Sequence, residues 1–201
     1  QRFSARVVMV SSLTAQGAEV TLKALRLGAV DFVLKPSQST SLTVQEIREE
    51  LIRKVKMAAQ INPLAIMAVG DAKTPSVLAS KPHLSSFSTR RHKLNIIGSS
   101  TGGPRALYQL IPQLPENLPA ALIIVQHMPP AFTRSLADGL NRISPLSVRE
   151  AQAGDLLATG LALVAPGGFH LMLERGSRIR LDDRAPKLHG VRPSLDVTLE
   201  S

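Results

Sequence analysis

The feature that most constrains the fold is a glycine-rich turn directly after an apolar run. Residues 94–97 read Leu-Asn-Ile-Ile, residues 98–103 read Gly-Ser-Ser-Thr-Gly-Gly, and a helical pattern follows. A buried strand that ends in such a turn and enters a helix is typical of open α/β sheets, which hold ligands at the carboxyl ends of their strands. The turn therefore predicts an α/β fold with a hydroxyl and backbone N–H groups at that edge.

A second expected strand ends in a histidine. The apolar run at residues 120–125 is followed by Gln126 and His127. Since successive parallel strands present their carboxyl ends at one edge, we expect His127 to lie near Ser100 of the glycine-rich turn. An imidazole can take the proton of a serine hydroxyl, and nearby N–H groups can stabilise an oxyanion. Ser100 is thus a candidate nucleophile and His127 a candidate base, with an anion-binding turn and a packed histidine as the alternatives.

Other side chains fit these roles less well. His170 alternates with apolar neighbours and His189 lies in a polar stretch, so both are weaker candidates for the base. A triad also needs an acid that orients the histidine. The available aspartates, none of them at a clear end of a parallel strand, are Asp155, Asp182, Asp183 and Asp196. A nucleotide-binding reading is disfavoured because neither G-x-G-x-x-G nor G-x-x-x-x-G-K-[ST] spacing occurs.

Composition excludes several classes of protein. The 201 residues contain no Cys, which excludes disulfides, thiol catalysis and Cys-based zinc sites. Aromatic residues make up only 3%, and the net charge of +9 is scattered along the chain, so no nucleic-acid partner is expected. No signal peptide is visible, and no apolar stretch approaches the ~18 residues of a membrane span. We therefore expect a cytoplasmic protein without membrane insertion.

The chain is expected to contain two α/β segments and a linker. Residues 1–60 predict a parallel sheet, because strands and helices alternate at 6–10, 19–27, 30–34 and 42–59. Residues 61–92 are rich in Ser, Pro, Ala, Lys and Thr without periodicity, which is typical of a linker.

The third segment, residues 93–201, predicts a second sheet. After the strand at 94–97, the patterns indicate strands at 120–125, 147–151 and 160–165 and helices at 104–114 and 130–143. Two alternating runs, 169–175 and 177–182, flank a Gly turn and predict a β-hairpin. Ser194 is a good N-cap for a helix that starts near residue 195.

The chain resembles the chemotaxis protein-glutamate methylesterase family, in which a receiver domain precedes a serine esterase. The resemblance rests on the blocks 97–103, 126–130, 132–133, 165–167 and 192–197. It implies a Rossmann-like parallel-sheet esterase domain, with Ser100 as nucleophile, His127 as catalytic histidine, and Thr101, Gly102 and Gly103 in the active-site turn. The family's third member, an aspartate in a Gly-Met-Gly-x-Asp-Gly segment, has no counterpart here. We therefore expect a fragment truncated at both ends and impaired by itself.

Residues 7–14 and 28–36 resemble the C-terminal part of a flavodoxin-like receiver domain. The resemblance places the switch hydroxyl at Ser11 and the phosphate-sensing lysine at Lys35. The phospho-accepting aspartate and the acidic pair that binds metal are expected upstream of residue 1. Mg²⁺ is accordingly expected only in a complete receiver, and hydrolysis is expected to need neither a metal nor an organic cofactor.

The resemblance also implies a function. The parent protein would hydrolyse glutamate γ-methyl esters on the cytoplasmic domain of methylated chemoreceptors, and would deamidate glutamine by the same acyl chemistry. A chemotaxis histidine kinase would control it through receiver phosphorylation. The alternative from another class is a non-catalytic response-regulator interaction module, which an incomplete triad would also fit.

Overall fold

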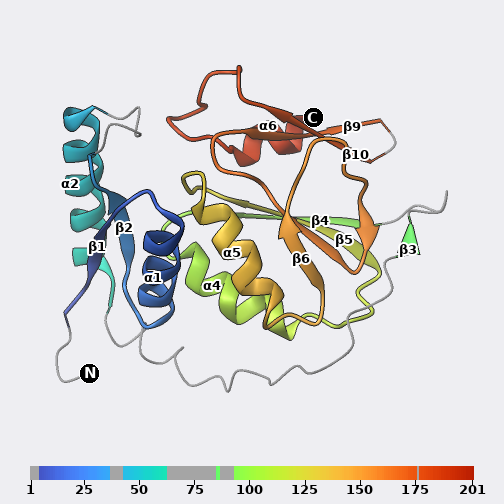
Figure 1. Cartoon of the computed structure of the whole chain (residues 1–201), viewed down its shortest axis with the longest axis horizontal. Coiled ribbons are helices and arrows are strands. Elements are labelled where there is room, and N and C mark those ends of the chain that lie inside the picture. The colour runs from blue at the N-terminus through green and yellow to red at the C-terminus, as the bar shows by residue number, and fades with distance from the viewer. Residues whose placement is uncertain (1–4, 37–42, 63–84, 87–92, 176) are drawn as a thin grey trace. The chain divides into compact units, whose positions relative to one another are not determined.

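The structure, a computed structural model, describes residues 5–36, 43–62, 85–86, 93–175 and 177–201 (Figure 1). The chain divides into two compact units, residues 1–73 and 74–201. Each unit is described by itself below.

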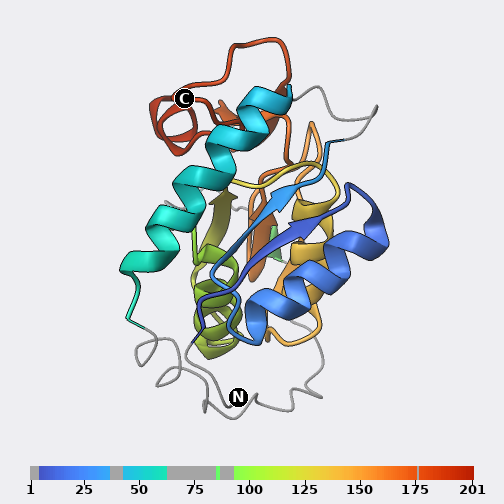
Figure 2. The ribbon, with the colours of Figure 1, turned by 90° about the vertical axis from the view of Figure 1, so that its left-hand side faces the viewer.

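The first unit is a small βαβα arrangement. Strands β1 (Val8–Ser11) and β2 (Asp31–Leu34) pair in parallel. Helices α1 (Ala15–Arg26) and α2 (Val44–Gln60) lie on opposite sides of the two strands (Figures 1 and 2). The alternation expected from hydrophobic periodicity is therefore present, and the parallel pairing is confirmed.

Both helices of this unit begin at threonine caps. Helix α1 starts four residues before the apolar pattern does, because the Thr14 side chain accepts a hydrogen bond from the Gly17 N–H at 2.9 Å. At α2, Thr43 accepts from the Glu46 N–H, and the Glu46 carboxylate accepts from the Thr43 N–H at 2.7 Å. The expected start at residue 19 is thus wrong, since the cap and not the periodicity sets the boundary.

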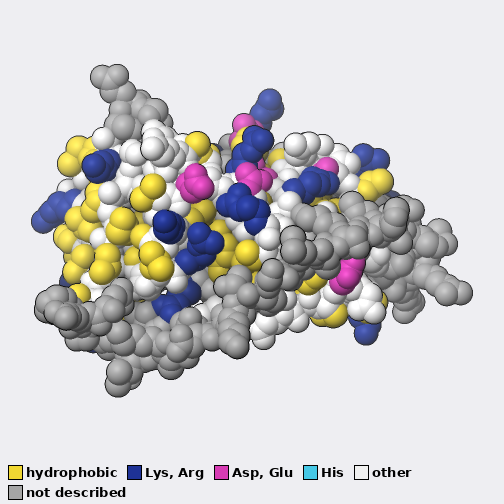
Figure 3. Space-filling model, turned by 60° about the horizontal axis from the view of Figure 1, so that its bottom comes forward, with side chains coloured by type: hydrophobic (Ala, Val, Ile, Leu, Met, Phe, Trp, Pro, Cys, Tyr) yellow, Lys and Arg dark blue, Asp and Glu magenta, His cyan; other side chains and the backbone are white. Residues whose placement is uncertain are grey.

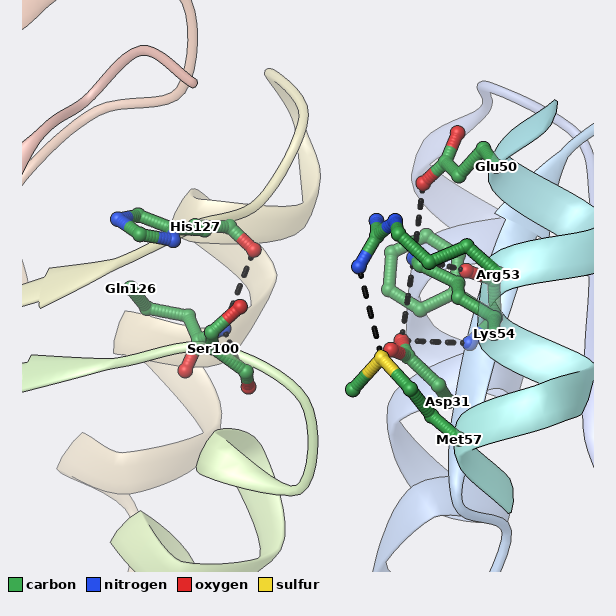
Figure 4. Close-up of polar contacts among 9 residues, drawn as sticks. Asp31, Glu50, Arg53, Lys54, Met57, Ser100, Gln126 and His127 are labelled. Atoms are coloured by element: carbon green, nitrogen blue, oxygen red, sulfur yellow. Dashed lines mark hydrogen bonds and ion pairs between the residues drawn. The ribbon is translucent and has the colours of Figure 1, made fainter. Parts of the chain in front are cut away.

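A lysine fastens α2 to the sheet. Lys54 donates to the Phe32 carbonyl oxygen at 2.6 Å and to an Asp31 carboxylate oxygen at 3.3 Å, and it pairs with Glu50 at 2.8 Å (Figure 4). Its side chain is only 12% exposed. These contacts provide partners for a mostly buried charge, so the lysine is a structural residue of this unit.

The second unit contains a four-stranded parallel sheet in the order β4-β5-β8-β6. Its strands are β4 (Lys93–Ser99), β5 (Ala120–Gln126), β6 (Ser147–Glu150) and β8 (Leu161–Val164). The remaining elements are α4 (Gly103–Leu110), the 3₁₀ turn η1 (Ile111–Gln113), α5 (Phe132–Asn141), β9 (His170–Glu174), β10 (Arg178–Asp182) and α6 (Leu195–Glu200). Strands β9 and β10 pair antiparallel, as the expected hairpin does.

The core of this unit lies on both faces of β5, whose seven residues are all buried. Ala121, Ile123 and Val125 pack in one cluster with Leu171 and Ile179 of the hairpin. Alternate side chains of a strand point to opposite faces, so the other residues of β5 face the helices α4 and α5 (Figure 1). Gln126, the last residue of β5, lies on this second face and belongs to the candidate site described below.

Two helix boundaries differ from those expected. The helix expected over 104–114 ends as α-helix at Leu110 and continues as the 3₁₀ turn, because Pro112 has no N–H to donate into an α-helical ladder. The helix expected from residue 130 begins instead at Phe132. Ala131 precedes it with a φ of 69°, a left-handed conformation that separates Pro130 from the helix.

The expected linker, 61–92, falls mostly outside the described residues. Within it, Ser85–Ser86 form β3, which pairs antiparallel with β7 (Ala158–Thr159). This pairing lies within the span expected to be a linker, and the bounds of that linker stay a prediction. Two-residue strands have too little pattern to be seen in a sequence, and the pairing depends on a partner more than 70 residues away.

Two other expectations concern the distribution of charged side chains and the absence of a membrane-spanning helix. On the face drawn in Figure 3, lysine and arginine side chains lie among hydrophobic and acidic ones. Among the helices that the structure describes, none is long and apolar enough to cross a membrane.

Candidate active site

The candidate nucleophile, Ser100, is the first residue after β4. It is exposed, and its carbonyl oxygen accepts a hydrogen bond from the Gly103 N–H at 2.8 Å, which closes the turn. Gly102 is the N-cap residue of α4 and has a φ of 77°, where a side chain would be strained. The glycine therefore permits the sharp passage from strand to helix that leaves Ser100 at the sheet edge.

The candidate base, His127, is the first residue after β5 and is partly buried. Strands β4 and β5 are neighbours in register, with Ser99 opposite Gln126, and the His127 N–H donates to the Ser99 carbonyl oxygen at 3.0 Å. The structure thus brings Ser100 and His127 to the same edge of the sheet (Figure 4).

Between these two described residues there is no direct side-chain hydrogen bond. Such bonds are often long in the absence of substrate and tighten in the reacting complex. The roles of the two residues remain predictions.

A buried glutamine joins the two strand ends. The Gln126 side chain is 2% exposed; its amide oxygen accepts from the Ser99 hydroxyl at 2.6 Å. Its amide nitrogen donates to the carbonyl oxygens of Ser100 and His127, each at 3.1 Å (Figure 4). We call these three hydrogen bonds the amide bridge. A Cβ at position 103 would collide with the Gln126 amide oxygen and lie 2.8 Å from the Ser99 Cβ, so the bridge needs glycine there.

Burial and a nearby carboxylate act in opposite directions on His127. Burial lowers the pKa of its imidazole below the ordinary value, and the charge of Asp196 raises it by a smaller amount. Asp196 lies in the first turn of α6, next to Leu195, and a Cβ at Gly98 of β4 would collide with the Leu195 side chain. The close approach of α6 to β4 therefore explains how a residue far along the chain reaches the histidine.

These features agree with the result of a family comparison. The model of the family described as CheB methylesterase matches residues 95–201 of this chain, a span that contains the whole candidate site. The chain belongs to the CheB methylesterase family. A relative from Symbiobacterium thermophilum, named protein-glutamate methylesterase/protein-glutamine glutaminase, is 51% identical over 202 residues, covering 97% of this chain and 56% of the relative.

Two proteins from Thermotoga maritima add to this result. A relative with the same printed name is 44% identical over 197 residues, covering 97% of this chain and 55% of the relative. The crystal structure of the Thermotoga maritima CheB methylesterase catalytic domain superimposes with a TM-score of 0.52 at 46% identity, covering 55% of this chain and 59% of that one. The resemblance read from the sequence is confirmed, and the chain spans about half the length of these two relatives.

Two of the sequence blocks that carry the family resemblance, 132–133 and 165–167, contact each other and the loop that follows His127. The Thr133 hydroxyl donates to the Glu150 carboxylate at 2.6 Å and accepts from the Gly167 N–H at 3.0 Å. A Cβ at Gly167 would collide with the backbone of Met128 and Pro129. The blocks 132–133 and 165–167 therefore hold the loop that follows His127, and we assign them a supporting role.

Four other sequence candidates, two histidines and two aspartates, have local hydrogen bonds or an exposed place in a turn. His170 is fully buried in β9, where Nε2 is 3.0 Å from the Pro186 carbonyl oxygen, and His189 is exposed with a φ of 52°. Asp155 accepts from the Gln152 N–H at 2.7 Å, and Asp182 accepts from two N–H groups of the turn that follows it. These two aspartates accept backbone hydrogen bonds in turns, and the identity of the triad acid stays a prediction.

The two predicted receiver residues lie at the ends of β1 and β2. Ser11 is buried, accepts from the Thr21 hydroxyl at 2.7 Å, and accepts through its carbonyl oxygen from the Lys35 N–H at 2.7 Å. Lys35 is exposed. The structure therefore places Ser11 and Lys35 at one edge of their unit, and their roles remain predictions.

Sequence reasoning missed Gln126, Thr133 and the influence of Asp196. Gln126 carried one usable signal, because a long polar residue at the end of a buried apolar strand must find hydrogen bonds. Asp196 carried none, since its proximity to His127 depends on how α6 packs on β4.

The effect of Asp196 predicts a shift in pH dependence. If His127 acts as the base, activity rises with pH as its imidazole loses a proton. Replacing Asp196 with asparagine removes a charge that favours the imidazolium, so the pKa of His127 should fall and the acidic limb of the kcat/KM profile should move to lower pH. Profiles of the full-length wild type, Asp196→Asn and Asp155→Asn would check this, and a shift to higher pH in Asp196→Asn would contradict it.

Proposed function

We propose that the full-length protein hydrolyses glutamate γ-methyl esters on methylated chemoreceptors and deamidates glutamine side chains, with Ser100 as nucleophile. The observation that carries the proposal is the placement of Ser100 and His127 at adjacent strand ends in a chain of the CheB methylesterase family. The relatives' names supply the reaction class, since they are called protein-glutamate methylesterase/protein-glutamine glutaminase.

The first half of the reaction forms an acyl-enzyme. Ser100 Oγ bonds to the ester carbonyl carbon while His127 takes the hydroxyl proton, which gives a tetrahedral oxyanion. The bond from that carbon to the methoxy oxygen then breaks. His127 returns the proton to the leaving oxygen, and methanol departs.

The second half restores the enzyme. Water adds to the acyl carbon as His127 takes one of its protons, the bond to Ser100 Oγ breaks, and the proton passes to the serine. The product is the free glutamate side chain. With a glutamine substrate, ammonia replaces methanol in the first half and the rest is unchanged.

Neither a metal nor an organic cofactor takes part in this route. The receiver of the full-length protein would bind Mg²⁺, but the described residues hold no group of three or more His, Cys, Asp or Glu side chains suited to a metal. By themselves these residues therefore do not fit a Mg²⁺ site.

The first unit is proposed to be the C-terminal part of a receiver. Its parallel βαβα order and the shared edge of Ser11 and Lys35 support this, because a hydroxyl and an ammonium group there suit a phosphoryl group. A chemotaxis histidine kinase would supply the phosphoryl group, the unphosphorylated receiver would restrain the esterase, and the protein would work in the cytoplasm.

The test is methanol release by the full-length protein from membranes that contain methylated chemoreceptors. We expect release that increases when the phosphodonor acetyl phosphate is added, and none from receptors that carry no methyl groups. Absence of release from folded wild-type protein under both conditions would contradict the proposal and favour the alternative, a non-catalytic response-regulator interaction module.

A further inference from the structure

In the amide bridge, each polar hydrogen of the buried Gln126 side chain has a hydrogen-bond acceptor. Gln126 Nε2 carries two hydrogens, and each reaches one carbonyl oxygen, that of Ser100 or that of His127. The amide oxygen accepts from the Ser99 hydroxyl at 2.6 Å. A buried amide with all of these groups paired is held rigidly, because any rotation leaves polar atoms without partners.

The surroundings fix which way the amide points. In the opposite orientation the amide oxygen would face two carbonyl oxygens, and none of these three atoms carries a hydrogen to donate. The Ser99 hydroxyl completes the arrangement because it can donate to Oε1. The missing side chain at Gly103 supplies the space that Oε1 occupies.

The two carbonyl oxygens belong to the candidate nucleophile and the candidate base. The Ser100 carbonyl also accepts from Gly103 in the turn, and the His127 backbone N–H bonds to Ser99, so the bridge crosses from one strand end to the other. A shift of about 1 Å between reacting groups lowers rates by about 10²-fold. A rigid cross-link at this place therefore controls the distance that catalysis depends on.

We propose that Gln126 is a positioning residue, which sets the separation of Ser100 and His127 through their backbones without touching substrate. The proposal rests on the proposed function. It assigns to Ser99 the lesser task of orienting the amide. It also gives a chemical reason for glutamine at the end of an otherwise apolar strand.

The first test replaces Gln126 with methionine, which keeps the length of the side chain and removes its hydrogen bonds. In the full-length protein we expect kcat for methanol release to fall about 10²-fold while KM stays within about twofold of wild type. The matched control is Gln113→Met, since the exposed Gln113 amide also donates to a carbonyl, that of Gln109 at 2.7 Å. The control should keep wild-type kcat.

A second variant keeps the proposal testable if Gln126→Met fails to fold. Ser99→Ala leaves the glutamine in place and removes the group that orients it, so we expect kcat to fall by less than about tenfold with KM unchanged. In the double variant, Ser99→Ala should add nothing to the loss caused by Gln126→Met, because both changes act on the same bridge.

Several results would overturn the proposal. These are an unchanged kcat in folded Gln126→Met, an unchanged kcat in Ser99→Ala, additive losses in the double variant, or a rise in KM that accounts for the whole loss. A purely structural role would lower the melting temperature and leave kcat intact well below it. Inactive wild-type protein would count against the proposed function itself. Failure of that function can therefore be told apart from failure of the positioning role of Gln126.

Discussion

Alanine at position 100 is expected to abolish methanol release by the full-length protein. The variant removes the oxygen that forms the acyl-enzyme, and loss of a serine hydrolase nucleophile lowers kcat on the order of 10⁶-fold. Because Ser100 is exposed, its hydroxyl contributes little to packing and the melting temperature should not change. Release of methanol from methylated receptors, measured beside thermal unfolding, checks both parts.

The neighbouring serine is the matched control. Ser99 carries the same side chain one residue earlier, but its hydroxyl donates to Gln126 Oε1. Ser99→Ala should therefore retain at least about a tenth of wild-type kcat. Equal losses at the two positions would refute the assignment of Ser100 as nucleophile.

Replacing His127 with alanine is expected to have the next largest effect. Without a base, the Ser100 hydroxyl keeps its proton and attacks slowly, so kcat should fall on the order of 10⁶-fold. The same variant should lose labelling of Ser100 by a serine-directed phosphonate, because labelling needs the activated hydroxyl. Mass spectrometry of the labelled peptide from the full-length protein measures this directly.

The control is His189→Ala, which removes an exposed histidine from a loop. It should be labelled at the wild-type rate. Undiminished labelling of His127→Ala would show that His127 is not the base.

Much of the fold was readable from local patterns. Buried runs such as 120–125 and the alternating hairpin strands have a period that a single element imposes, and β5, β9 and β10 follow them closely. Boundaries were less readable, because α1 and α5 begin where a cap or a left-handed residue permits it. Strand β3 was invisible, since a two-residue strand exists through its partner β7.

The candidate site, too, could be predicted from the sequence only in part. The strand–turn–helix pattern around Ser100 and the histidine after the next strand were both visible, since parallel order alone brings such ends together. The amide bridge was not visible, because it requires the register that sets Ser99 opposite Gln126 and the empty space at Gly103.

Residue types at short spacing were enough to predict the family, the α/β class and the candidate pair Ser100 and His127. The surroundings of this pair could be found from the three-dimensional structure alone. It places Gln126 between the two strand ends and brings the charge of Asp196 to bear on His127. Hydrogen bonds depend on short distances in space, and charges act through space over somewhat longer ones, whatever the separation along the chain.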